Sequence, residues 1–170
     1  MSAFIELVLT RGYEGLTAED ISRKANVGRS TFYLHYASKA ALLKETMRNP
    51  SNQMAACVDG NLTPQQLVPL LDHFREQRTV NRTFFADPIR SLWVKSLAAL
   101  IEPRLAARRG GSQSDLPPSL VALMIAEMQI ALVTHWLTCK SALKAELIAA
   151  TLIANTRAML SAFSRSERTK

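Results

Sequence analysis

Hydrophobic residues recur at helical spacing along most of the chain, and no segment shows the strict alternation expected of a half-buried strand. The first such pattern predicts a helix over residues 2–11. Its core-facing residues are expected to be Phe4, Ile5, Val8 and Leu9. Gly12 follows the pattern and is a common residue type just after a helix.

Two short helices joined by a turn are predicted next. Thr17 and Asp20 have the spacing of a capping box, in a variant where Asp replaces the usual Glu or Gln. The apolar residues expected to hold this helix are Ile21, Ala25 and Val27. The turn is assigned to Gly28, which tolerates backbone angles that other residues resist.

The second of these helices is predicted over about residues 29–36. Phe32 is its expected core residue, and the remaining face carries hydrogen-bond donors: Arg29, Ser30, Thr31, Tyr33 and His35. A helix set across another by a short turn, with donors on its free side, is the arrangement that enters the major groove of DNA.

The middle of the chain continues the helical pattern. Ser38 is expected to cap a helix that runs to about Arg48, and Pro50 is expected to break it over residues 49–52. Thr63 with Gln66 predicts the start of a helix reaching about residue 77. Its expected inward residues are Leu67, Leu70, Leu71 and Phe74.

Three further helices are predicted towards the C-terminus. One is opened by Asp87-Pro88 and runs to about Arg109, with Pro103 as a kink or break. A turn-rich loop over 110–118 separates it from helices over 119–139 and 141–163, and a polar, frayed tail is expected from Ser164.

The segment 119–139 is apolar on almost all sides, which leaves two interpretations. About twenty such residues are long enough to cross a bilayer. However, Glu127, Gln129 and His135 lie within the segment, and unpaired charge is costly in a membrane. We therefore expect no membrane partner and favour a helix buried on one side by its own domain and on the other by a second chain.

Composition and charge add little that is specific. Hydrophobic residues make up 48% of the 170-residue chain, which is typical of a globular protein. The net charge of +7 suits a nucleic-acid partner, but residues 1–49 carry seven Lys/Arg against five Asp/Glu, so the charge is not concentrated there. No signal-peptide pattern opens the chain, and two distant cysteines are expected to be plain thiols, so we expect a cytoplasmic protein.

The segment from Gly12 to Leu43, GYEGLTAEDISRKANVGRSTFYLHYASKAALL, resembles the N-terminal domain of TetR-type transcriptional repressors. The matching elements are Gly12-Tyr13, Thr17, Ile21, Val27-Gly28, Thr31-Phe32-Tyr33, Tyr36, Ser38-Lys39 and Leu42. Two features depart from the family pattern: Ser22 occupies the usual Ala position, and Pro50 follows the fourth helix. The family's first helix usually also has a short, often basic segment before it. Either the native start lies upstream, or the DNA-binding domain of this chain uses a shortened first helix.

The resemblance implies an all-α fold, with a helix-turn-helix DNA-binding domain over 1–48 and a larger helical domain over 49–170 for effector binding and dimerisation. It implies a homodimer that binds a palindromic DNA operator, as a repressor released by a small-molecule effector. The DNA-binding residues expected on this basis are Thr17, Arg29, Ser30, Thr31, Tyr33, His35 and Lys39. For Thr17 and Thr31, capping of their own helical turn is an equally open interpretation.

The larger domain holds two further candidate sets. Residues that either line a ligand cavity or form plain core are Phe74, Phe85, Trp93, Met124, Glu127, Met128 and His135. Residues expected at a dimer interface of the last two helices are Leu120, Met124, Ile130, Trp136, Leu147, Leu152, Asn155 and Met159. Glu127 and His135 lie in an apolar helix, so each is expected to need a polar partner.

No enzyme motif is present. The three histidines are scattered, and the sequence has no Gly-rich phosphate loop, nucleophile elbow or metal-ligand spacing, so we expect no enzymatic activity, cofactor or metal. Two alternatives to a regulator remain open. One is a helical protein that sequesters a ligand and carries a degenerate DNA-binding head, and the other is an adaptor that binds a foreign partner.

Overall fold

The computed structural model describes residues 1–108, 116–139 and 143–164, and within these ranges it contains helices and no strands. The elements are α1 (Ser2–Arg11), α2 (Ala18–Lys24), α3 (Arg29–His35), α4 (Lys39–Thr46), α5 (Arg48–Ala55), the 3-10 helix η1 (Ala56–Asp59), α6 (Pro64–Glu76), α7 (Arg78–Phe84), α8 (Ile89–Arg108), α9 (Pro118–Thr138) and α10 (Ala145–Ser164). The all-α prediction is confirmed.

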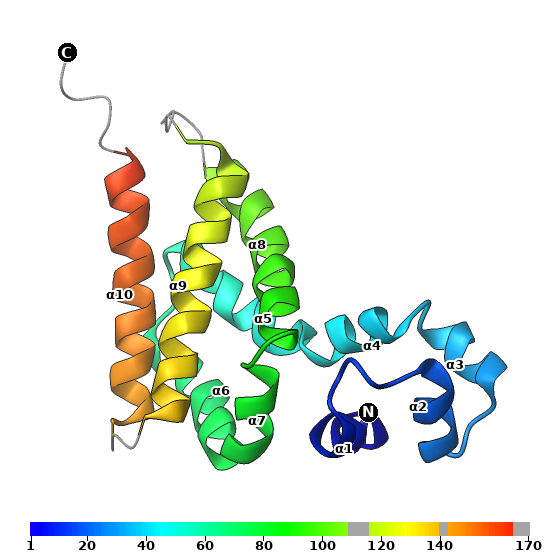
Figure 1. Cartoon of the computed structure of the whole chain (residues 1–170). Coiled ribbons are helices and arrows are strands. Elements are labelled where there is room, and N and C mark those ends of the chain that lie inside the picture. The colour runs from blue at the N-terminus through cyan, green and yellow to red at the C-terminus, as the bar shows by residue number, and fades with distance from the viewer. Residues whose placement is uncertain (109–115, 140–142, 165–170) are drawn as a thin grey trace.

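The helices form a small head and a larger body (Figure 1). The head consists of α1 to α4, and α5 leads from it into the body. In the body, α8 packs along α9, and α10 packs against both α6 and α9. The helix α7 contacts α1, so the head meets the body at a second place besides the chain connection.

Each helix of the head buries hydrophobic side chains, which are continuous with the core of the body. The buried residues of the head helices are Phe4, Leu7, Val8, Ile21, Phe32, Leu42 and Leu43. Leu9, predicted to face the core, is 39% exposed, and Leu7 takes the inward position. The reason is geometric, because positions 4, 7 and 8 share one face of a helix whereas position 9 lies beside it.

The turn between α2 and α3 differs from the prediction. The left-handed residue is Asn26, with φ 54°, whereas Gly28 is extended with φ −66° and ψ 150°. Asn tolerates the left-handed region better than other non-glycine residues, so the turn does not require a glycine. Ala25 and Val27 are exposed, and Ser22 is the residue of α2 that packs beside Ile21.

Pro50 does not break the chain into a loop, which corrects the expectation for residues 49–52. It is the third residue of α5, where a backbone N–H would have no partner inside the helix. The interruption comes earlier, at Met47, which lies between α4 and α5 with φ −92° and ψ −1°.

The body follows the predicted order, with α5, η1 and α7 as additions. The Thr63 and Gln66 capping box opens α6, and its four expected inward residues are buried. The short helix α7 was not predicted. Pro103 lies inside α8 without ending it, and α10 begins four residues later than expected. The predicted loop over 110–118 and the predicted tail lie largely outside the described residues.

The helix α9 is the one membrane-span candidate among the described residues by length and hydropathy, and half of its most apolar window is buried in the fold. Its buried residues face α8 and α10, which is the packing of a core helix in a bundle.

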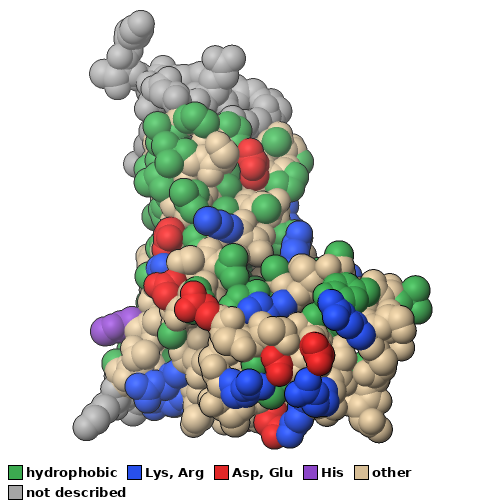
Figure 2. Space-filling view, turned by 45° about the vertical axis from the view of Figure 1, so that its right-hand side comes forward, with side chains coloured by type: hydrophobic (Ala, Val, Ile, Leu, Met, Phe, Trp, Pro, Cys, Tyr) green, Lys and Arg blue, Asp and Glu red, His purple; other side chains and the backbone are tan. Residues whose placement is uncertain are grey.

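Charged and apolar side chains occupy different parts of the surface. Figure 2 shows Lys and Arg gathered over the lower part of the molecule, interspersed with Asp and Glu, and hydrophobic side chains over the upper part of the bundle. The large hydrophobic residues exposed on α9 are Leu120, Leu123 and Met124.

Candidate nucleic-acid interface

The helix α3 has one buried side chain. Phe32 is 5% exposed and packs edge-on against Tyr33, with ring centroids 5.4 Å apart, and at a tilt against Tyr36 at 5.8 Å. The five predicted DNA-contacting residues of this helix, Arg29, Ser30, Thr31, Tyr33 and His35, are all exposed. The structure therefore brings them to the free surface of the head, held there by a single aromatic anchor.

Arg29 is available for a partner outside the chain. Its guanidinium carbon lies 5.7 Å from the centroid of the Tyr33 ring, and it forms no salt bridge with any described residue. Five other basic residues of the segment 1–49 are engaged: Arg11, Arg23, Lys24 and Arg48 pair with carboxylates, and Lys39 donates to backbone carbonyls. Apart from Arg29, only Lys44 among the described Lys and Arg of residues 1–49 lacks such a contact.

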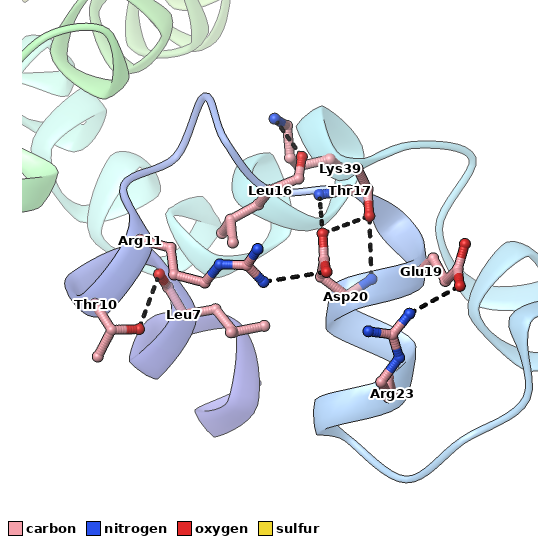
Figure 3. Close-up of polar contacts among 9 residues, drawn as sticks. All are labelled: Leu7, Thr10, Arg11, Leu16, Thr17, Glu19, Asp20, Arg23 and Lys39. Carbon is pink, nitrogen blue, oxygen red and sulfur yellow. Dashed lines mark hydrogen bonds and ion pairs between the residues drawn. The ribbon is translucent and has the colours of Figure 1, made fainter.

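The start of α2 is held by a reciprocal cap (Figure 3). The Asp20 amide donates to the Thr17 hydroxyl at 3.1 Å, and the Thr17 amide and hydroxyl donate to the Asp20 carboxylate at 3.0 and 2.6 Å. These bonds, with the Arg11 guanidinium at 3.1 Å as a smaller cause, lower the pKa of Asp20 to about 2. Thr17 therefore uses its hydroxyl for capping, which was the alternative to its predicted DNA contact.

Lys39 was predicted to contact a phosphate, and the structure gives its ammonium group another role. Nζ donates to the carbonyls of Tyr13 at 2.8 Å, Leu16 at 2.8 Å and Glu14 at 3.2 Å, and it lies 4.4 Å from the centroid of the Tyr13 ring. An ammonium has three donors, so all of them are occupied by the loop between α1 and α2. Lys39 fixes that loop to the start of α4.

The sequence interpretation missed one exposed residue of α3. Leu34 is 81% exposed, more than any other large hydrophobic residue in the described part of the chain. The signal was available, because a residue two positions from the inward Phe32 points almost directly away from the core in a helix. An apolar side chain at this place suits contact with the methyl group of thymine.

The seven predicted ligand residues do not form one site. Phe74, Phe85 and Trp93 pack together in the body, with ring centroids 4.4 to 6.0 Å apart, and Trp93 Nε1 donates to the buried Ser51 hydroxyl at 2.9 Å. The four residues on α9 are exposed or half-buried: Met124, Glu127, Met128 and His135.

The expectation that both polar residues of α9 need a partner is confirmed for Glu127, which pairs with Arg90 of α8 within the chain. It is wrong for His135, which is exposed to solvent. The buried polar side chain of this helix is instead Gln129, which is fully buried. Its amide nitrogen donates to the Met54 carbonyl at 3.3 Å and to the Thr156 hydroxyl at 3.2 Å, and thereby joins α9 to α5 and α10.

The residues predicted at the dimer interface divide into a buried group and an exposed group. Ile130, Trp136 and Leu152 are at most 5% exposed, so they belong to the core of their own chain and not to an interface. Leu120, Met124, Leu147 and Asn155 are exposed, and Met159 is half-buried. A helix that is apolar on nearly all sides gives no sequence signal that separates its two faces.

Neither cysteine is part of a site. Both are free, and burial raises the pKa of the Cys57 thiol to about 12, so it stays protonated. Within the described residues, no group of three His, Cys, Asp or Glu side chains is placed to hold a metal ion.

Residues 1–46 match the model of the family "Bacterial regulatory proteins, tetR family". The putative mycofactocin biosynthesis transcriptional regulator MftR of Mycobacterium tuberculosis is 26% identical over 153 residues, which cover 81% of this chain and 77% of that protein. The uncharacterized HTH-type transcriptional regulator YxbF of Bacillus subtilis is 46% identical over 43 residues, which span 25% of this chain and 11% of that protein.

Among solved structures, a TetR transcriptional regulator from Streptococcus agalactiae superposes with a TM-score of 0.56 at 27% identity, covering 91% of this chain and 89% of that one. In this chain α2 and α3 are joined by a short turn, and α3 exposes a face of hydrogen-bond donors. This arrangement is typical of helix-turn-helix DNA-binding proteins. Within that class, residues 1–46 match the tetR family of bacterial regulatory proteins, and the chain as a whole has the fold of a TetR transcriptional regulator.

Proposed function

We propose that the protein binds a palindromic operator as a homodimer, blocks transcription by occupying it, and leaves it when a small-molecule effector binds. In this proposal residues 1–48 bind DNA, and residues 49–170 bind the effector and form the dimer, in the cytoplasm. The observation that carries it is the exposed face of α3, whose one arginine has no carboxylate partner among the described residues.

Each exposed residue of α3 has a proposed role. Arg29 suits a bidentate contact with the O6 and N7 atoms of guanine. Tyr33 and His35 suit phosphate or base contacts, and Ser30 and Thr31 suit phosphate contacts near the start of the helix. One short helix contacts few bases. Recognition of a specific DNA site therefore needs the α3 helix of a second protomer, bound to the same duplex.

The surface of α9 and α10 supports dimerisation. Leu120, Leu123 and Met124 on α9 and Leu147 on α10 are between 39% and 52% exposed, which is unusual for so many large apolar side chains on adjacent helices. In Figure 1 the helix α10 and the head lie on opposite sides of the bundle. A two-fold interface on these helices therefore leaves both heads free to contact DNA.

The test is binding to the DNA upstream of the protein's own gene, measured by fluorescence anisotropy at two salt concentrations. We expect tight binding that weakens with salt, because phosphate contacts release counterions. Arg29→Ala and Tyr33→Ala should each weaken it by about tenfold or more. Arg75→Ala is the matched control, since Arg75 is an exposed, ion-paired arginine on α6 in the body.

Weak binding that neither depends on sequence nor changes in the α3 variants would contradict the proposal. It would favour the alternative of a ligand-sequestering or adaptor protein with a degenerate head.

A further inference from the structure

Arg29 and Tyr33 form a pair on the exposed face of α3. They are four residues apart, which places their side chains one turn apart on the same side of the helix. The guanidinium carbon of Arg29 lies 5.7 Å from the centroid of the Tyr33 ring, within the range of a cation–π contact. No carboxylate among the described residues forms an ion pair with Arg29, so no such group draws its guanidinium away from the ring.

The ring of Tyr33 is itself held by a buried residue. Phe32, the one buried side chain of α3, packs edge-on against it with an interplanar angle of 86°. Tyr33 is 46% exposed, so part of its ring remains free of the core. A series of contacts therefore leads from Phe32 through the Tyr33 ring to the Arg29 guanidinium.

A guanidinium that stacks on a ring keeps its hydrogen-bond donors available. The contact uses its flat face, and its five N–H groups point outward in its own plane. Two of them can still meet O6 and N7 of a guanine. The ring also restricts the positions that the long side chain of Arg29 adopts, which reduces the entropy lost on binding. In a DNA groove, where water is excluded, the attraction between ring and guanidinium becomes stronger.

We propose that Tyr33 is a positioning residue whose ring holds the Arg29 guanidinium for contact with one guanine in each half-site of the operator. This rests on the proposed function, because Arg29 contacts a guanine only if α3 enters the major groove. A phosphate contact by the Tyr33 hydroxyl would add affinity equally for all sequences. A ring that orients Arg29 instead strengthens the preference for one base pair.

The experiment measures the affinity of the full-length protein for its operator and for operators in which one G·C pair of a half-site is changed to A·T. Each guanine is tested in turn by fluorescence anisotropy. We expect one position at which the change weakens wild-type binding by about tenfold or more. Arg29→Ala should lose this preference, which identifies the guanine that Arg29 contacts.

Two substitutions at Tyr33 separate the ring from the hydroxyl. Tyr33→Phe keeps the ring, and its preference for that guanine should stay within about twofold of the wild-type preference. Tyr33→Leu removes the ring and should reduce the preference by about fivefold, although Arg29 is still present. Leu34→Ala is the matched control and should keep the wild-type preference, because Leu34 is exposed on another side of the same helix. Thermal unfolding checks that each variant is folded.

A double variant tests whether the ring acts through the arginine. Arg29→Ala combined with Tyr33→Leu should lose no more of the preference than Arg29→Ala alone. An unchanged guanine preference in Tyr33→Leu, or an equal loss in Tyr33→Phe, would overturn the positioning role. Specific wild-type binding in which no base-pair preference depends on Arg29 would overturn it too. Failure of the proposed function is a different result, since the wild-type protein would then not distinguish its operator from unrelated DNA.

Discussion

Lys39 shows how one side chain can have a different role from the one its position predicts. A lysine just after a helix N-cap suits a phosphate, but its three donors face the carbonyls of residues 13, 14 and 16. The sequence shows that a lysine follows the N-cap of α4, but it does not show which acceptors its flexible side chain reaches. The same limit applies to Thr17, whose hydroxyl completes the Asp20 cap.

We expect Lys39→Ala to lower the free energy of unfolding by about 2 kcal/mol, because three carbonyls lose a charged donor. Urea unfolding measures this. Lys44→Ala is the control, an exposed lysine of the same helix with no described hydrogen bond, and it should cost no more than about 0.5 kcal/mol. Equal stability of the two variants, with operator binding lost only in Lys39→Ala, would instead support a direct phosphate contact.

The low pKa of Asp20 predicts a pH dependence of stability. A pKa depressed to about 2 in the folded protein, from 3.8, means that folding favours the carboxylate. The resulting stabilisation is present above the unfolded pKa and is lost as the pH falls through about 2. Asp20→Asn should therefore lose less stability than the wild type between pH 5 and 2, measured by urea unfolding at each pH. Glu14→Gln, with no described ion pair, should follow the wild-type curve, and an Asp20→Asn curve parallel to the wild type would contradict the interpretation.

At the scale of elements, the sequence predicted best where side chains cap a helix. The starts of α2 and α6 follow from Thr17 with Asp20 and Thr63 with Gln66, and the structure has both caps. Pro50 led to a wrong break because proline is tolerated in the first turn of a helix, and the sequence does not show that a new helix begins just before it. The helix α7 was missed because its seven residues are too few to show a clear period.

The turn of the helix-turn-helix gives a prediction at this scale. Asn26 has φ 54°, so Asn26→Ala should cost about 1 kcal/mol by forcing a methyl-bearing residue into the left-handed region. Asn26→Gly is the control and should be neutral or slightly stabilising, since glycine adopts that region freely. Urea unfolding distinguishes the two, and an Asn26→Ala variant as stable as Asn26→Gly would show that the turn adopts another conformation in solution.

At the scale of the whole molecule, the all-α architecture and the order of the longer helices could be predicted, but the direction in which their faces point could not. Almost every position of α9 is apolar, so Ile130 inside the chain and Met124 on its surface look alike in sequence. The same limit applies to the candidate binding residues: those on one short helix could be predicted, and those assembled from several helices could not. The exposed donors of α3 were predicted because Phe32 marks the inward face, whereas the cavity of about 420 Å³ between head and body is lined by residues of six helices and by Met47, which no local pattern brings together.

Dimerisation through α9 and α10 can be tested with a single charge. Leu147 is 52% exposed on α10, so Leu147→Glu should leave the fold intact and convert a dimer to a monomer, as measured by analytical ultracentrifugation. Leu9→Glu places the same charge at an exposed leucine of the head and should leave the dimer unchanged. A Leu147→Glu protein that sediments as the wild type would show that this face is not the interface.

The most direct test of the central claim, that two copies of α3 bind one operator, is selection of binding sequences from a random pool of duplex DNA. We predict a consensus with two-fold symmetry, whose half-sites are separated by about one helical turn or a multiple of it. With Leu34→Ala, the same selection should keep the symmetry and relax one thymine preference in each half-site, because the exposed leucine would no longer contact a methyl group. A pool that yields no consensus, or a single asymmetric site unchanged by substitutions on α3, would contradict the claim.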